Sequence, residues 1–143
     1  MKRHPANKNQ IKASNPLVST WLSANAGAGK TKVLSDRVAL LLLEGVSPDK
    51  ILCLTYTKAA ATEMQNRLFE LLGDWAMRDI EFLKQKVMEI GPNLELTDKK
   101  LKYARTLFAR AIEAPGGLKI QTIHSFCSNL LKINGLNNSS AIF

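Results

Sequence analysis

The fold class of this chain is indicated by one stretch of small residues that ends in a lysine and a threonine: Ala24-Asn25-Ala26-Gly27-Ala28-Gly29-Lys30-Thr31. A short β-rich run, 17–23, precedes the stretch, and apolar residues at helical spacing follow it as far as Gly45, a predicted helix C-cap. Small residues between a strand and a helix let backbone N–H groups curl around a phosphate, to which the helix N-terminus adds its positive dipole end. The stretch therefore predicts a phosphate-binding loop, with Ala24 where the usual pattern has its first glycine.

Two side chains of this loop carry the expected chemistry. Lys30 would bridge the β- and γ-phosphates of a nucleotide, and the Thr31 hydroxyl would ligate Mg²⁺. The structural alternative is a Gly/Ala-rich turn that only caps a helix. The lysine–threonine pair in a strand–helix context favours the nucleotide site, with ATP and Mg²⁺ as its ligands.

Further strands and helices alternate along the chain. Buried strands are predicted at 51–56 and 118–123, and each is followed by a helix, at 58–72 and at 125–133. This order is typical of an α/β domain with a parallel sheet and flanking helices.

The region between these two halves has a different pattern. Two amphipathic helices are predicted at 74–90 and 97–113, separated by Gly91-Pro92-Asn93, with their charges on solvated outer faces. We expect them to form a helical insertion. The expected organisation is a basic, polar and mobile arm, a phosphate-loop half, the insertion, a strand–helix unit and a frayed tail: 1–16, 17–73, 74–117, 118–133 and 134–143.

Composition sets outer limits on function. With 143 residues, 45% of them hydrophobic and 22% charged, the chain is expected to form a single globular domain. No apolar run approaches the ~20 residues of a membrane span, and the N-terminus lacks a secretory pattern, so we expect a cytoplasmic protein with Cys53 and Cys127 reduced and buried. The net charge of +8 permits a nucleic-acid partner without proving one.

Three motifs in order resemble those of superfamily-1 DNA helicases of the UvrD/Rep kind. The phosphate loop resembles motif I, 55–64 (TYTKAAATEM) resembles motif Ia, and 122–127 (TIHSFC) resembles motif Ib. Gln10 matches the glutamine of the Q motif, which contacts adenine. The long helical stretch after Met64, with 23–27 and 111–117, is most similar to the RecB/AddA branch of double-strand-break repair helicase–nucleases.

The resemblance implies an incomplete RecA-like P-loop NTPase domain that carries a helical insertion and belongs to an ATP-dependent DNA helicase. It also implies contacts with single-stranded DNA: hydroxyls that donate to phosphates, rings that stack on bases and one positive charge. The residues concerned are Tyr56, Thr57, Lys58, Thr122, His124 and Ser125. Their structural alternatives stay open, because threonines are ordinary at strand ends and a lone histidine is more often structural.

The acidic pair of motif II, which positions Mg²⁺ and water for hydrolysis, is not found in the sequence. No Asp or Glu follows Glu113, and the apolar runs that end at Glu44 and Asp74 lie within helical patterns. We therefore expect a truncated chain that binds ATP weakly, has single-stranded DNA as a candidate second ligand, and neither unwinds DNA nor turns over ATP at a useful rate. A nuclease/helicase partner subunit or the missing remainder of the motor would complete it.

Two other hypotheses account for parts of the pattern. A non-catalytic remnant or regulator that binds nucleotide, DNA or a partner chain remains the main alternative. A small P-loop kinase would explain the phosphate loop and the chain length, but it leaves the two helicase-like loops unexplained. The resemblance favours a helicase family, with the isolated chain not competent as an enzyme.

Overall fold

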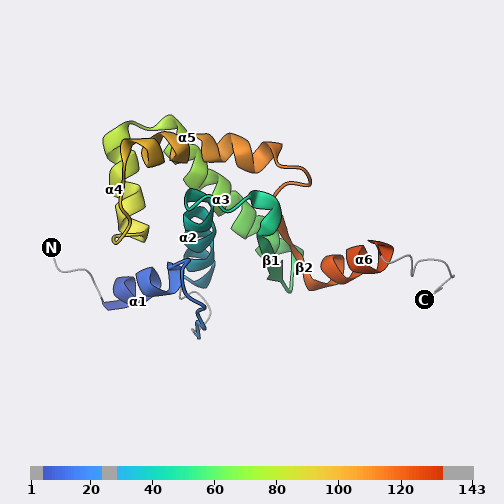
Figure 1. Cartoon of the computed structure of the whole chain (residues 1–143). Coiled ribbons are helices and arrows are strands. Elements are labelled where there is room, and N and C mark those ends of the chain that lie inside the picture. Colours follow the sequence, from blue (N-terminus) through green and yellow to red (C-terminus); the bar gives the residue numbers. More distant parts are fainter. Residues whose placement is uncertain (1–4, 24–28, 134–143) are drawn as a thin grey trace.

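A computed structural model describes residues 5–23 and 29–133. The part described is an α/β fold with two β-strands and six α-helices, as Figure 1 shows. A short 3₁₀ helix, Pro48–Lys50, precedes the first strand. The elements are α1 (Pro5–Ser14), α2 (Lys30–Leu43), β1 (Leu52–Thr55), α3 (Lys58–Met77), α4 (Ile80–Ile90), α5 (Asp98–Glu113), β2 (Lys119–Thr122) and α6 (Ile123–Ile133).

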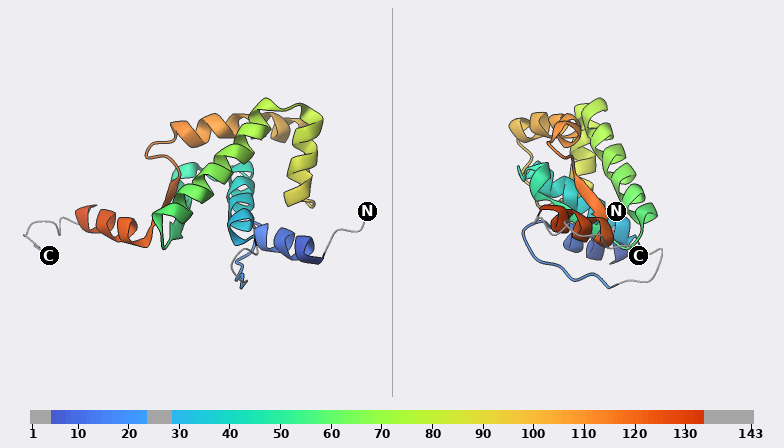
Figure 2. Two further views of the ribbon diagram at one scale, coloured as in Figure 1. Left: turned by 180° about the vertical axis from the view of Figure 1, so that it is seen from behind. Right: turned by 90° about the vertical axis from the view of Figure 1, so that its right-hand side faces the viewer.

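The two strands form a parallel sheet, as the sequence predicts. Their register runs from Leu52 opposite Lys119 to Thr55 opposite Thr122. A parallel pair needs a crossover that carries the chain back to the starting edge, and here α3, α4 and α5 provide it. In Figure 2 α3 crosses the molecule diagonally between the sheet and the other two helices.

The hydrophobic core lies among α2, α3, α4 and α5. Leu40 of α2, Leu68 and Trp75 of α3, Leu83 of α4 and Leu107 of α5 are almost completely buried in one cluster. The helices predicted as an insertion with solvated faces do expose charges, but their apolar faces pack into this same core. They are therefore a structural part of the body that carries the phosphate-loop helix.

Helix α2 has the boundaries that its sequence predicts. It begins at Lys30, directly after Gly29, whose φ of 80° lies in the left-handed region. At the other end Gly45 has a φ of 90°, and its N–H donates to the Leu42 carbonyl at 3.0 Å. The Val46 N–H donates to the Leu41 carbonyl at 3.0 Å, which completes a Schellman motif. The predicted end of the helix before Gly45 is confirmed, with Glu44 as the C-cap residue and Gly45 directly after it.

The predicted helix 74–90 is in fact interrupted. Helix α3 continues to Met77, Arg78 is extended, and α4 begins at Ile80. The Asp79 side chain caps the new helix by accepting a hydrogen bond from the Phe82 N–H at 2.9 Å. An aspartate that competes for backbone N–H groups ends one helix and starts another without disturbing the apolar spacing.

The N-terminal region departs from its prediction in two ways. Residues 17–23 form no strand: Leu17 is 82% exposed and Trp21 is 93% exposed. A strand needs a hydrogen-bonded neighbour, and the described residues offer this segment none. Residues 5–14, expected within a mobile arm, instead form helix α1, which packs on α2 and buries Ala13 and Ser14.

The two thiols also differ from expectation. Cys53 is half-buried in β1, and burial raises the pKa of its thiol to about 11. Cys127 is exposed on α6, so the prediction that both are buried is wrong for Cys127. Within the described ranges, no helix combines the length and apolarity that crossing a bilayer requires.

Candidate functional site

The two helicase-like loops lie side by side at one edge of the sheet. The strands are parallel and their last residues, Thr55 and Thr122, are paired, so the residues that follow leave the sheet at the same carboxyl edge. We call 55–58 the β1–α3 junction and 122–125 the β2–α6 junction. In the left view of Figure 2, α2, α3 and α6 all start on the lower side of the molecule, which brings the phosphate-loop helix to the same side.

The β1–α3 junction is held by hydroxyl groups. Thr57 caps α3 by accepting a hydrogen bond from the Ala60 N–H at 3.1 Å. The Thr55 hydroxyl donates to the Thr57 carbonyl at 2.9 Å, which fixes the turn between strand and helix. Tyr56 stands out from this turn with 88% of its surface exposed, and Lys58 is exposed beside it. A fixed backbone therefore presents an open aromatic ring and a positive charge.

The β2–α6 junction has a similar cap but a different exposure. Thr122 accepts a hydrogen bond from the Ser125 N–H at 3.2 Å, and its hydroxyl lies 2.9 Å from the Ser125 hydroxyl. All six residues predicted to contact DNA lie in the described part of the chain, and of these only Thr122 is buried. His124 is exposed and Ser125 is half-buried. The Thr122 hydroxyl is thus engaged in building the junction.

Three of the eight residues of the predicted phosphate loop, Gly29, Lys30 and Thr31, lie in the described part of the chain. The predicted site residues Ala24, Asn25, Ala26, Gly27 and Ala28 lie outside the described residues. Gly29 precedes α2, and its carbonyl accepts a hydrogen bond from the Val33 N–H at 3.0 Å. Lys30 and Thr31 form the first turn of α2, both half-buried, at the positive end of the helix dipole.

Gln10 lies next to this loop. Its side chain comes from α1, and a Cβ atom added to Gly29 would stand 3.0 Å from Gln10 Nε2. Glycine is thus favoured at position 29 both by the left-handed backbone and by the amide packed against it. The fold brings together Gln10, Gly29, Lys30 and Thr31, although α1 was not expected from the sequence.

Lys32 and Asp36 form an ion pair near the start of α2. Lys32 Nζ lies 2.6 Å from an Asp36 carboxylate oxygen, one turn further along α2. Burial nevertheless raises the pKa of Asp36, although the hydrogen bond and the charge of Lys32 act to lower it.

Among the described residues, no group of three or more histidine, cysteine or acidic side chains is arranged to hold a metal ion.

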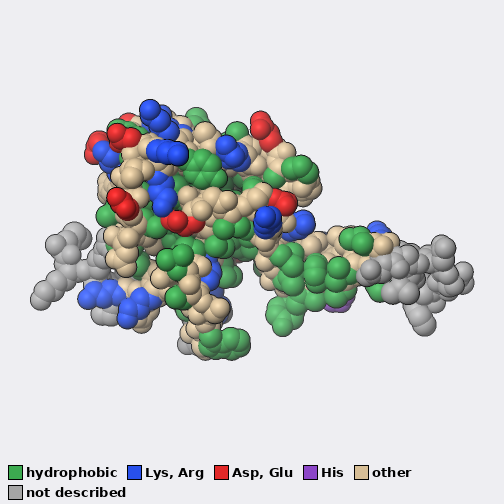
Figure 3. Space-filling view, in the orientation of Figure 1, with side chains coloured by type: hydrophobic (Ala, Val, Ile, Leu, Met, Phe, Trp, Pro, Cys, Tyr) green, Lys and Arg blue, Asp and Glu red, His purple; other side chains and the backbone are tan. Residues whose placement is uncertain are grey.

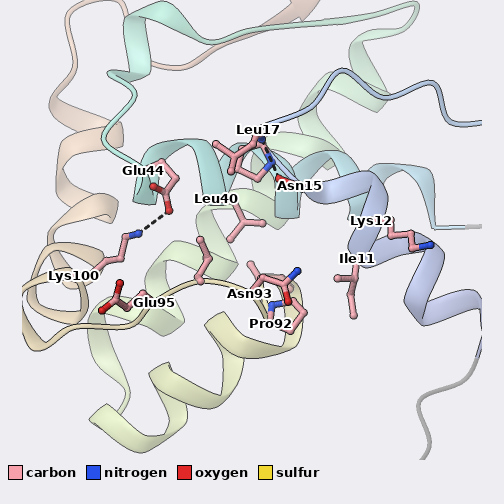
Figure 4. Close-up of a pocket in the computed structure, with 14 residues that line it drawn as sticks. Ile11, Lys12, Asn15, Leu17, Leu40, Glu44, Pro92, Asn93, Glu95 and Lys100 are labelled. Carbon is pink, nitrogen blue, oxygen red and sulfur yellow. Dashed lines mark hydrogen bonds and ion pairs between the residues drawn. The ribbon is translucent and has the colours of Figure 1, made fainter.

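A cavity of about 470 Å³ lies between α1, α2 and the loop that joins α4 to α5 (Figure 4). Ile11, Leu17 and Leu40 give it apolar walls, and the Glu44–Lys100 ion pair, 2.7 Å long, stands at one side. None of the predicted site residues lines it. It is therefore separate from the site built by Gln10 and the phosphate loop.

Sequence reasoning did not single out Arg37 of α2, which contacts α1, the helix that carries Gln10. Its guanidinium donates hydrogen bonds to backbone carbonyls of the end of α1 and the segment after it. An arginine within a helical pattern carries no local signal of such a role, because its partners are backbone atoms far away in sequence.

Comparison with known proteins matches residues 6–141 to the UvrD/REP helicase N-terminal domain family. Similar curated proteins are AddA chains of the ATP-dependent helicase/nuclease. One from Clostridium perfringens (strain SM101) is 34% identical over 116 residues, 79% of this chain and 7% of the relative. One from Latilactobacillus sakei is 32% identical over 111 residues, 78% of this chain and 10% of the relative.

A third relative with this name, from Clostridium kluyveri, is 34% identical over 122 residues, which are 83% of this chain and 8% of the relative. The chain thus spans a tenth or less of the length of each of these relatives. No solved structure matches it significantly.

Proposed function

The chain belongs to the UvrD/REP helicase N-terminal domain family, and on this premise we propose that it is the ATP-binding part of an ATP-dependent DNA helicase of the AddA type. Family membership, which the motifs predicted, is confirmed by the family match and by the relatives. The proposal for this chain rests on one observation: Gln10 lies against Gly29 at the start of α2, where Lys30 and Thr31 also lie.

The residues present suit a nucleotide with Mg²⁺. Gly29 leaves room beside the loop that a Cβ would fill, and the N-terminus of α2 favours negative charge. In the proposed site Gln10 would contact adenine, Lys30 would neutralise phosphate charge and the Thr31 hydroxyl would ligate Mg²⁺, together with the predicted loop residues 24–29. In a complete helicase, hydrolysis of the bound ATP would supply the free energy for unwinding.

The two junctions are the proposed track for single-stranded DNA. Exposed Tyr56 and His124 are suited to stacking on bases, while Lys58, Thr57 and Ser125 can meet the phosphates. Thr122, predicted to contact a phosphate, is proposed instead to hold the junction, because its hydroxyl is buried and already bonded to Ser125.

We propose further that this region is one part of a larger RecA-like domain. Parallel sheets are normally covered on both faces, yet Leu52 and Leu54 of β1 are each 43% exposed. Further secondary-structure elements packed on this face, from the rest of a helicase polypeptide or from a partner chain, would cover them. ATP hydrolysis needs a carboxylate pair beside the Mg²⁺, and this sequence has no Asp or Glu after Glu113. The chain by itself is therefore proposed to bind ATP in the bacterial cytoplasm without unwinding DNA.

Titration with a fluorescent ATP analogue and Mg²⁺ tests the nucleotide site. Saturable binding is expected for the wild type and for the control variant Lys84→Ala, which removes an exposed lysine from α4. Lys30→Ala should weaken binding at least about tenfold, the loss expected from removing a charge-assisted hydrogen bond. Absence of saturable wild-type binding would contradict the ATP site, and robust ATP turnover that depends on Lys30 would contradict the proposed inactivity.

The DNA track is tested with a fluorescent single-stranded oligonucleotide. Tyr56→Ala should lose ~1–3 kcal/mol of binding free energy, the usual worth of one stacked base. Met77→Ala is the matched control, because Met77 is 87% exposed at the far end of α3. Equal loss in both variants, or none in Tyr56→Ala, would remove Tyr56 from the track.

A further inference from the structure

Arg37 connects the phosphate-loop helix to the end of α1. It lies on α2, and its Nη1 donates to the Ala13 carbonyl at 3.2 Å and to the Asn15 carbonyl. Its Nη2 donates to the Val18 carbonyl at 2.6 Å. One guanidinium thus holds the last turn of α1 and the segment that leads from α1 towards the phosphate loop.

The chemistry of this contact is specific to arginine. The last carbonyls of a helix lack partners within the helix, and a cation placed there also offsets the negative end of the helix dipole. A planar guanidinium offers five donors in a fixed fork, whereas a lysine ammonium is a point charge on a flexible stem. Lysine at position 37 could keep the charge but not bond all three carbonyls in this geometry.

Helix α1 depends on tertiary contacts for its position. It has ten residues, and isolated helices shorter than ~12–15 residues are marginal in water. Its second anchor is Ser14, whose hydroxyl lies 3.3 Å from the Ile90 carbonyl at the end of α4. Ser14 ties α1 to α4, and Arg37 ties it to α2, the helix that begins with Lys30.

Gln10 lies about one turn before Ala13, the residue of α1 whose carbonyl Arg37 holds. Its amide stands against Gly29, so α1 touches the nucleotide loop through Gln10 and is fixed to the same helix α2 through Arg37. We infer that Arg37 is a positioning residue for nucleobase recognition: through α1 it holds Gln10 at the place where adenine would be contacted. This inference rests on the ATP site proposed above and extends it to the choice of base.

The inference makes a prediction that a general loss of stability would not. Lys30 and Thr31 belong to α2, which is held by its own residues in the hydrophobic core, so binding of the phosphates should survive loss of the Arg37 contact. What should be lost is the preference for adenine over guanine. Arg37→Gln should therefore resemble Gln10→Ala.

The test is competition against a bound fluorescent ATP analogue, with Mg²⁺, by ATP, GTP and inorganic tripolyphosphate. In Arg37→Gln the ratio of ATP to GTP affinity should fall about tenfold, as for the loss of one good hydrogen bond, with tripolyphosphate competing as in the wild type. The double variant Gln10→Ala/Arg37→Gln should lose no more preference than either single variant. Arg67→Gln, which removes an exposed arginine from α3, is the control and should keep the wild-type ratio.

The outcomes separate this inference from the proposed function. A wild type that binds no nucleotide would defeat the proposed ATP site and the inference together. Lys30-dependent binding with no adenine preference in the wild type would overturn the role of Arg37 together with the adenine contact proposed for Gln10, while the phosphate site would stand. A preference retained in Arg37→Gln would overturn only the role of Arg37. Equal weakening of all three competitors would show a purely structural role and would also overturn it. Should Arg37→Gln not fold, Arg37→Lys decides the question by the same ratio.

Discussion

The molecule has two regions that differ in how firmly they are packed. The helical body, made of α2, α3, α4 and α5, buries Leu68, Trp75 and Leu83 completely. The strand platform, made of β1, β2 and α6, leaves Leu52 and Leu54 partly open, and α6 has no buried residue. Figure 3 shows hydrophobic side chains on the surface over this platform.

Stability and the proposed function therefore belong to different regions of the molecule. Both junctions that would contact DNA stand on the thinly packed platform, while the helices first predicted as an insertion supply much of the core. Loops that bind ligands are commonly drawn from the less stable part of a fold.

Truncation of leucines should lower the free energy of unfolding far more in the helical body than in the strand platform. Leu68→Ala in α3 and Leu83→Ala in α4 are each expected to lower the free energy of unfolding by ~2–5 kcal/mol, because both leave a cavity in one shared core. Leu54→Ala, on the open face of β1, should cost less than ~1 kcal/mol, since much of that side chain is already in water. Chemical denaturation measures all three. A mild effect of Leu83→Ala would mean that α4 is not part of the body.

The Cys53 thiol should make the stability of the platform depend on pH. Its pKa is raised to about 11 by burial, so the folded chain holds the thiol proton more tightly than the unfolded chain does. The resulting stabilisation is complete below the ordinary thiol pKa and is lost as the pH rises towards 11. Wild type should therefore lose stability relative to Cys53→Ala over this range in denaturation at stepped pH. Parallel curves for the two proteins would show that Cys53 is not held in an apolar environment.

The stability cost of removing each threonine cap allows the two junctions to be compared directly. Thr57→Ala and Thr122→Ala each remove a cap, at a typical cost of ~1 kcal/mol. Thr122→Ala should cost more than Thr57→Ala, because Thr122 is buried and its loss also deprives the Ser125 hydroxyl of a partner. Serine at either position is the control and should restore most of the lost stability. Equal costs would mean that the two junctions are equally exposed in solution.

The smallest effect is expected at an exposed ion pair on α3. Arg67 Nε lies 3.1 Å from a carboxylate oxygen of Glu63, four residues earlier on the helix, and both side chains are about half exposed. Arg67→Ala should cost ~0.3–0.5 kcal/mol, and the cost should shrink in high salt. A cost above that of the Thr57 cap would contradict the view that surface charges contribute little to the body.

Local signals in the sequence predicted much of this structure. The start of α2 after Gly29, its end at Gly45, the strands at 51–56 and 118–123 and the break at 91–93 are each marked by residues that act on their own neighbours. The end of α3 was missed, although Asp79, followed by Glu81 in the first turn of α4, is a recognisable capping signal. That signal was hidden by apolar spacing that continues across the break.

Features that depend on distant contacts were not predictable in the same way. Residues 17–23 have the composition of a strand, but a strand forms only beside a neighbour. Cys127 follows an apolar residue in an amphipathic helix, yet no residue of α6 is buried. Arg37 could not be singled out, since its partners are carbonyls that any sequence would present.

The pairing of Leu52 with Lys119 also has a consequence for how the protein is made. The crossover of α3, α4 and α5 separates the two strands in the sequence, so pairing the strands closes a long loop. Each helix, in contrast, forms from local contacts. During synthesis the Tyr56 turn leaves the ribosome well before the Thr122 turn exists. The crossover helices can collapse in that interval and act as a template that sets the register of the sheet. The carboxyl edge of the sheet, where both junctions lie, can then close only after this crossover has been made.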